Sequence, residues 1–164
     1  MARVHNLVVT TVRPRQPPPG LTEVQKHSWD RLVRVLDAGE AILRLAAVGG
    51  ETVGHALTFV DISPRVGEMI LGWQGERPDL PARLRAGRAA LVTDLLVRDG
   101  YRRLGIGADL MHDSAQVARA AGCARLILHV NPQNTAAQIL YEKLGFRRER
   151  QPEDDVAWEY VLDL

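Results

Sequence analysis

One short segment limits the fold of this chain more than any other: an apolar run enters a polar turn, and a basic loop with two glycines then opens a helix. The loop is Arg102-Arg103-Leu104-Gly105-Ile106-Gly107. The first N–H groups of a helix lack partners inside the helix, and the helix dipole adds partial positive charge there. Glycine removes the Cβ atoms that would hold an anion away from the backbone, and arginine adds positive charge. The segment therefore predicts a phosphate-binding turn between a strand and a helix.

Two common nucleotide-binding motifs are excluded by the residues that follow this loop. No Lys-Ser or Lys-Thr pair follows Gly107, as a Walker A loop requires, and Leu110 leaves the pattern G-x-G-x-x-G incomplete. The alternative to a binding loop is an arginine-rich packing turn, in which the glycines serve close contact between strand and helix.

A second block with its own residue pattern lies downstream. A strand-like run at 124–130 is followed by the pattern N-x-x-A-x-x-x-Y-x-K-x-G-F, which begins at Asn134 and ends at Phe146. Together with R-x-x-G-x-G from Arg102, this pattern resembles the conserved blocks of the GNAT superfamily, the GCN5-related N-acetyltransferases, in order and separation. The resemblance is close over about residues 91–148 and holds elsewhere only in outline.

This resemblance implies an α/β GNAT fold, with three layers (α/β/α) around a mixed central sheet of six to seven strands. It implies a single domain over residues 1–164, with an acyl-CoA-binding core at about 91–148. The implied cosubstrate is acetyl-CoA, and no metal is implied. A homodimer is compatible with the resemblance.

Composition supports a folded globular chain and argues against several other classes of protein. The chain has 164 residues, 46% of them apolar, which suits one domain with a sizeable core. Its 21 basic and 20 acidic residues are interspersed, which argues against a nucleic-acid partner. Cys123 is the one cysteine, so neither an internal disulfide nor a cysteine metal site is expected. We see no secretory leader and no apolar run of about 20 residues, and so expect a cytoplasmic protein without a membrane partner.

Hydrophobic periodicity and turn residues predict the order of the elements. The predicted strands cover residues 4–12, 41–48, 52–61, 89–97, 125–130, 146–150 and 156–162. One predicted helix begins at a Thr22-x-x-Gln25 capping box and ends near Gly39, and two more cover residues 105–121 and 135–144. The segment 63–88 is the hardest to read, and there we expect a short strand at 68–73 and a helical turn at 81–86.

The resemblance assigns cofactor contacts to both blocks. In the family, the pantetheine arm pairs with the strand before the loop, and the pyrophosphate lies on the loop. Carried over residue by residue, the cofactor-binding set is Leu95, Leu96, Val97, Arg102, Arg103, Leu104, Gly105, Ile106, Gly107, Ala108, Asn134 and Tyr141. The parallel strands around Val97 and Val130 are expected to separate and admit the thioester. The turn departs from the family pattern at Asp99-Gly100, and we expect the Asp99 carboxylate to point away from the loop.

The reaction implied is N-acetylation, in which an acceptor amine attacks the thioester of acetyl-CoA directly. Tyr141 stands where the family often places the hydroxyl that assists the leaving thiolate, although it also fits the apolar stripe of its helix. Asn134 suits a helix N-cap as well as a cofactor contact. As the base that takes the amine proton we favour Asp94, with His129, His55 and ordered water as alternatives.

The acceptor is left open by the sequence beyond a primary amine of a small molecule or protein. The segment 63–88 carries acids that suit a cationic amine and five arginines that suit an anionic group. Two other functions stay open. One is a non-catalytic acyl-CoA-binding regulatory module, and the other is an acyltransferase that uses a longer acyl-CoA.

Overall fold

The computed structural model describes residues 6–14, 16, 20, 22–74, 77–150 and 157–164. The strands among them are β1 (Leu7–Val12), β2 (Ala41–Val48), β3 (Glu51–Phe59), β4 (Ala89–Val97), β5 (Arg125–Val130), β6 (Arg147–Arg150) and β7 (Trp158–Asp163). The helices are α1 (Glu23–Asp37), α2 (Pro64–Gln74), α3 (Leu80–Ala86), α4 (Ile106–Ala120) and α5 (Thr135–Lys143), with a 3-10 turn, η1, at Asp99–Tyr101.

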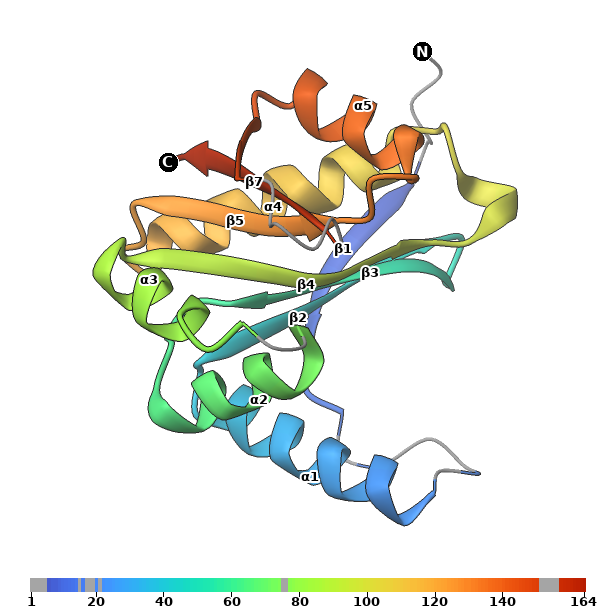
Figure 1. Ribbon diagram of the computed structural model, residues 1–164. Helices are drawn as coiled ribbons and strands as arrows, with labels where there is room; N and C mark the ends of the chain where they lie inside the picture. Colours follow the sequence, from blue (N-terminus) through green and yellow to red (C-terminus); the bar gives the residue numbers. More distant parts are fainter. Residues whose placement is uncertain (1–5, 15, 17–19, 21, 75–76, 151–156) are drawn as a thin grey trace.

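These strands form one mixed sheet in the order β1-β2-β3-β4-β5-β7-β6. Neighbouring strands are antiparallel except β4 and β5, which are parallel and joined through α4. Helices α4 and α5 lie on one face of the sheet, and α1, α2 and α3 lie on the other (Figure 1). The arrangement confirms the predicted three-layer α/β fold, with seven strands in the sheet.

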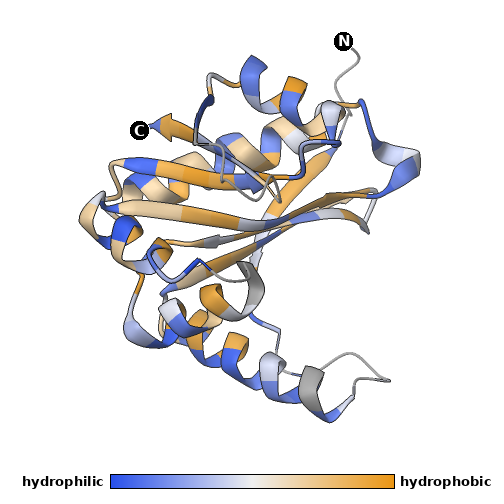
Figure 2. Ribbon diagram, viewed as in Figure 1, coloured by the Kyte–Doolittle hydropathy of each residue, from blue (hydrophilic) through white to orange (hydrophobic). Residues whose placement is uncertain are grey.

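Alternation along the strands divides the core between the two faces of the sheet. Phe59 and Leu91 pack with Ile70 and Leu84 on the face covered by α1, α2 and α3. Tyr160 and its neighbours pack with α4 and α5 on the other face. Figure 2 shows mostly hydrophobic strands and helices that carry both kinds of residue. Each helix therefore covers the sheet with an apolar side and keeps a polar side outward.

The parallel pair at the centre of the sheet is short. β4 and β5 are paired only from Ala89 opposite Arg125 to Val92 opposite Leu128. On its other side β4 pairs with β3 from Leu91 to Val97, with a register shift that leaves Thr93 as an extra residue. The second half of β4 thus turns away from β5, which confirms the predicted separation of these two strands.

The predicted strand at 68–73 is wrong, because these residues belong to helix α2 (Pro64–Gln74). Val66, Met69 and Ile70 are buried together, and a spacing of three and four residues is that of one helix face. Glycines and β-propensity in this stretch concealed the helical period. The predicted helical turn at 81–86 is confirmed as α3.

Most other predicted elements are confirmed, with shifted ends. The strand predicted at 52–61 ends at Phe59, because the N–H groups of Val60 and Asp61 both donate to the carbonyl of Glu40. Helix α1 begins at Glu23, but the Gln25 side chain of the predicted capping box lies outside the described residues. The same holds for residues 4–5 of the first strand and for the 151–155 connection of the final hairpin.

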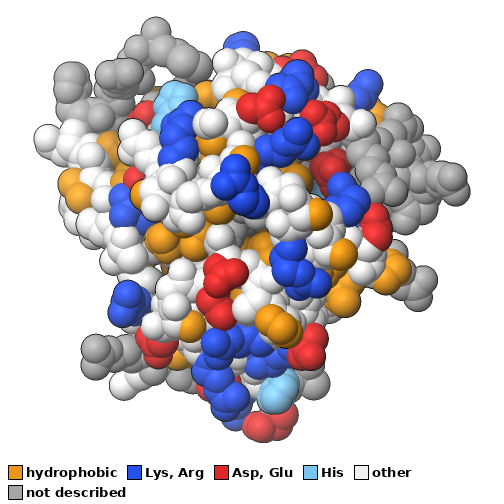
Figure 3. All heavy atoms as spheres, turned by 90° about the vertical axis from the view of Figure 1, so that its left-hand side faces the viewer, with side chains coloured by type: hydrophobic (Ala, Val, Ile, Leu, Met, Phe, Trp, Pro, Cys, Tyr) orange, Lys and Arg blue, Asp and Glu red, His pale blue; other side chains and the backbone are white. Residues whose placement is uncertain are grey.

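The surface carries both signs of charge, and the single cysteine lies half-buried below it. Figure 3 shows a face on which Lys and Arg side chains are interspersed with Asp and Glu. Within the described residues, no helix is long and apolar enough to cross a membrane. The Cys123 thiol donates to the carbonyl of Val60 at 3.3 Å, and burial raises its pKa, which disfavours the reactive thiolate form.

Candidate functional site

The predicted phosphate loop ends in left-handed backbone at the start of α4. Backbone φ is 62° at Arg103 and 86° at Gly105, the N-cap of α4. This conformation is disfavoured for a residue with a Cβ, so Gly105 suits it and Arg103 is strained. A Cβ added at Gly105 would meet no atom within 4 Å. Open space therefore lies beside this turn, next to the first N–H groups of α4, which have no partners inside the helix.

The second glycine of the loop serves close packing. A Cβ added at Gly107 would lie 3.3 Å from Leu140 Cδ2, so a side chain there would push α4 away from α5. A second close approach was missed by sequence reasoning. A Cβ added at Gly54 on β3 would lie only 2.7 Å from the carbonyl oxygen of Leu96 on β4.

Arg102 is already engaged by its own loop. Its Nε donates to the carbonyl of Val97 at 3.0 Å, and its guanidinium lies 3.0 Å from the Asp99 carboxylate. The expectation that Asp99 points away from the loop is therefore wrong. An exposed ion pair within one turn is worth little, about 0–1 kcal/mol, so an incoming phosphate can compete with Asp99 for this arginine.

A polar clamp fastens the loop to the start of β3. The Glu51 carboxylate accepts hydrogen bonds from Arg98 and from the Tyr101 hydroxyl. Hydrogen bonds from Tyr101 and Arg98 lower the pKa of Glu51, and the same contact with Glu51 raises the pKa of Tyr101. Sequence reasoning missed this clamp, because Glu51 and Tyr101 are 50 residues apart and neither belongs to a motif.

A surface cavity of about 490 Å³ lies beside this clamp. Its walls are Leu96, Val97, Arg98, Asp99, Gly100, Tyr101 and Arg102. Three of the predicted cofactor residues, Leu96, Val97 and Arg102, thus line one hollow. Ile106 does not reach it with its side chain, which is 1% exposed in the core, so this residue can offer a ligand only its backbone.

Asn134 and Tyr141 belong to α5 and its N-cap, and this helix packs against the start of α4 where Leu140 lies beside Gly107. The Asn134 side chain caps this helix by accepting from the N–H of Ala137 at 3.1 Å. Tyr141 is 8% exposed and packs against the rings of Phe146 and Tyr160. Burial raises the pKa of Tyr141 to about 12, so its hydroxyl keeps its proton at neutral pH.

Two of the predicted candidate bases are paired with each other. His55 Nε2 lies 2.6 Å from the Asp94 carboxylate across β3 and β4. This hydrogen bond raises the pKa of His55 and lowers the pKa of Asp94. Asp94 is therefore a weaker base than an unpaired carboxylate, and the structure weakens the preference given to it from the sequence.

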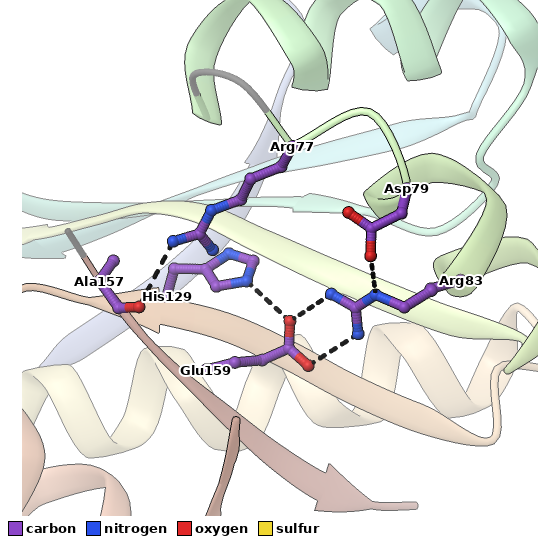
Figure 4. Close-up of polar contacts among 6 residues, drawn as sticks. All are labelled: Arg77, Asp79, Arg83, His129, Ala157 and Glu159. Carbon is purple, nitrogen blue, oxygen red and sulfur yellow. Dashed lines mark hydrogen bonds and ion pairs between the residues drawn. The ribbon is translucent and has the colours of Figure 1, made fainter. Parts of the chain in front are cut away.

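The third candidate base, His129, belongs to a separate buried network (Figure 4). Its Nε2 lies 2.9 Å from the carboxylate of Glu159 on β7. Arg83 of α3 donates to both oxygens of Glu159, at 3.0 and 2.8 Å, and to Asp79 at 3.0 Å. Arg83 and Glu159 carry no sequence signal, because 76 residues separate them.

Comparison with known proteins identifies the family. The sequence model described as "Acetyltransferase (GNAT) family" matches residues 4–146. The chain belongs to the GNAT acetyltransferase family. Within the described residues, no group of three or more metal-ligating side chains is found in this GNAT protein.

Individual relatives agree with this assignment. The chain is 33% identical over 125 residues to the N-alpha-acetyltransferase of Sulfurisphaera tokodaii, covering 75% of this chain and 66% of that protein. It is 36% identical over 73 residues to GCN5-related N-acetyltransferase 4, chloroplastic, of Arabidopsis thaliana, covering 44% of this chain and 25% of that protein. The GNAT chain thus spans at most about two thirds of these curated relatives.

A solved structure of similar fold is a GNAT family acetyltransferase from Elizabethkingia anophelis with acetyl-CoA bound. The two folds superpose with a TM-score of 0.62, at 16% sequence identity, over 97% of this chain and 99% of the other. At this identity the likeness concerns the fold, and it agrees with the GNAT architecture described above.

Proposed function

We propose that this GNAT protein transfers the acetyl group of acetyl-CoA to a primary amine by direct attack of the amine. One observation carries the proposal: β4 parts from β5 after Val92 and then leads into the left-handed glycine turn at the start of α4. An open strand edge and an anion-binding helix start follow one another along the chain. The pantetheine arm of acetyl-CoA is extended and carries amides that suit the strand edge, and the pyrophosphate at its end suits the helix start.

The loop supplies the complement to the pyrophosphate. The first N–H groups of α4, next to Gly105, have no partners inside the helix, and each helix-terminus interaction is worth about 0.3–1 kcal/mol, up to about 2 when partly buried. Arg102 and Arg103 are both exposed and add positive charge. The strand edge at Leu95, Leu96 and Val97 complements the pantetheine amides, although Arg102 already occupies the carbonyl of Val97.

Tyr141 suits a hydrogen-bond donor to the leaving thiolate. Its pKa is about 12, and an ordinary thiol titrates near 8.5, so full proton transfer to the thiolate costs about 5 kcal/mol. A neutral hydroxyl that donates without giving up its proton avoids that cost. Asn134, which caps α5, orders the helix that presents this hydroxyl.

Calorimetric titration with acetyl-CoA and with free CoA tests the proposal. The wild type is expected to bind both ligands with micromolar affinity. Gly105→Asp places a Cβ and a negative charge in the space proposed for the pyrophosphate, in left-handed backbone, and is expected to weaken binding by at least about 100-fold.

Gly122→Asp is the matched control at the other end of α4. Gly122 also has left-handed backbone, with φ of 81°, and open space around its Cβ position. The Gly122→Asp variant is expected to bind acetyl-CoA and CoA with the wild-type affinity. A folded wild type that binds neither ligand would contradict the proposal, and binding without transfer to any amine would leave only an acyl-CoA-binding module.

A further inference from the structure

Two buried polar side-chain atoms, one on each strand, lack a hydrogen-bond partner where β4 and β5 part. Val92 and Leu128 are the last paired residues, and the next residues along the two strands are Thr93 and His129. Thr93 Oγ1 and His129 Nδ1 are both buried and make no hydrogen bond. Leaving such an atom unpaired costs about 1–3 kcal/mol. Such an atom occurs on each strand, one residue beyond the last pair. We take this to indicate a ligand group that completes both hydrogen bonds.

The contact with Glu159 fixes which nitrogen of His129 carries a proton. A carboxylate only accepts hydrogen bonds, so His129 Nε2, at 2.9 Å, is the donor. In the neutral ring the lone pair then lies on Nδ1, the unpartnered atom. The His129 and Glu159 side chains are only 4% and 5% exposed, so water competes little for either group.

Glu159 is well held for this orienting role. Arg83 donates to both of its oxygens, and Asp79 lies on the far side of Arg83 (Figure 4). Burial raises the pKa of Glu159, but hydrogen bonds from His129 and Arg83 outweigh burial and bring the pKa to about 2. The carboxylate therefore stays ionised and keeps its hold on Nε2 throughout the neutral range.

The network and Tyr141 lie on opposite faces of the sheet. Glu159 alternates along β7 with Tyr160, which packs with Tyr141 on the side of α5. Arg83 comes from α3, on the other side. A thioester in the gap between β4 and β5 would have a proton acceptor on one face and a proton donor on the other. That division suits a reaction in which the amine loses a proton and the thiolate gains a hydrogen bond.

We propose that His129 is the catalytic base that takes the proton of the acceptor amine, and that Glu159 and Arg83 are positioning residues for it. This inference rests on the proposed acetyltransferase function. In the step, the amine nitrogen bonds to the thioester carbonyl carbon, Nδ1 takes the N–H proton, and the C–S bond breaks to release CoA thiolate.

Other charged groups lie near the His129 ring. Arg77, before α3, donates to the carbonyl of Ala157 at 3.3 Å and reaches into the same region (Figure 4). On the neighbouring strands, Asp94 and His55 are hydrogen-bonded to each other at 2.6 Å. Asp94 is 58% exposed, which makes it the less shielded of the two candidate bases.

Nitrogen-15 NMR of the histidine side chains tests the proton position without any acceptor. In the neutral ring, His129 is expected as the tautomer with Nε2 protonated and Nδ1 free. In Glu159→Gln the orienting charge is lost, and the two tautomers are expected to approach equal populations. A wild-type ring that carries its proton on Nδ1, or on both nitrogens, would overturn the inference.

Turnover tests the chemical role. Acetyl-CoA is offered with a diamine, an amino sugar and a short peptide with a free N-terminus, and released thiol is measured for the amine that reacts fastest. His129→Gln keeps a donor for Glu159, so this variant is expected to retain the fold. It is expected to lower kcat by about 100-fold or more and to remove the rise of kcat with pH, with KM for acetyl-CoA nearly unchanged.

His112→Gln is the matched control, because His112 is an exposed histidine on α4. It is expected to keep wild-type kinetics. If His129→Gln keeps the wild-type rate and pH profile, or if His55→Gln is the variant that loses them, the inference is wrong and the proposed function stands. If the wild type acetylates none of the amines, the proposed function fails and the base assignment with it.

Discussion

Burial decides what individual side chains can do at this site. Tyr141 lies among aromatic rings, and burial alone raises its pKa to about 12. The same residue type on the surface, Tyr101, instead hydrogen-bonds to the Glu51 carboxylate and belongs to the clamp on the loop. In the proposed reaction the buried phenol of Tyr141 donates to the thiolate, because a single donor counts for more where water is excluded.

Tyr141→Phe is therefore expected to lower kcat by about 100-fold while leaving KM for acetyl-CoA nearly unchanged. The packing with Phe146 and Tyr160 is retained, so the midpoint of thermal unfolding should hardly move. Steady-state kinetics and a melting curve on the same preparation check both points. An unchanged kcat would show that Tyr141 is only a core aromatic.

Elements far apart in the chain are held together by the charged network around Glu159. Arg83 joins α3 to β7, and His129 joins β7 to β5. Breaking a buried pair leaves an uncompensated charge, which is commonly costly by about 3–5 kcal/mol. The network therefore fixes α3 over the sheet at the point where the parallel strands separate.

This network predicts how stability depends on pH. The pKa of Glu159 falls from its ordinary 4.5 in the unfolded chain to about 2 in the folded protein. Its ionised form stabilises the fold fully above pH 4.5, and this contribution is lost as pH falls towards 2. The difference in unfolding free energy between wild type and Glu159→Gln is therefore expected to shrink over that range.

Thermal unfolding of both proteins across this pH range is the measurement, with Glu68→Gln, at a carboxylate 74% exposed, as the control. A difference that stays constant with pH would show that Glu159 does not titrate as the geometry requires.

On the scale of the whole molecule, the sheet is continuous on one side of β4 and open on the other. β3 stays paired with β4 as far as Val97, whereas β5 leaves it after Val92. Gly54 allows the close approach of β3 that holds β4 from one side only. The separation of β4 from β5 thus follows from how the strands of the sheet are paired.

Acetyl-CoA is expected to slow backbone hydrogen exchange in peptides that cover residues 93–97 and 102–108. Peptides from β1 and β2, at the far edge of the sheet, should keep their rates. Exchange followed by mass spectrometry, with Gly105→Asp as the control that loses the effect, checks this outcome. Protection spread evenly over the sheet, or absent from 93–97, would contradict binding at the open edge.

Local patterns were enough to predict much of this protein. The bounds of β4 at 89–97 and of β5 at 125–130 agree with the sequence prediction, because both are apolar runs with clear turn signals. The loop at Gly105 and the cap at Asn134 are also local features, fixed by a few neighbouring residues. Helix α2 was missed because it is short, and because glycines interrupt its helical pattern of apolar residues.

Tertiary structure alone decided which charged side chains meet. Whether Asp94 is free or paired with His55, and which nitrogen of His129 stays open, depends on residues 39 and 30 positions away. Such pairings follow from strand order and register, which no single segment encodes. The sequence by itself determined the fold and the likeness to a CoA loop, because these rest on short-range patterns, and the folded sheet determined the electrostatics of the gap.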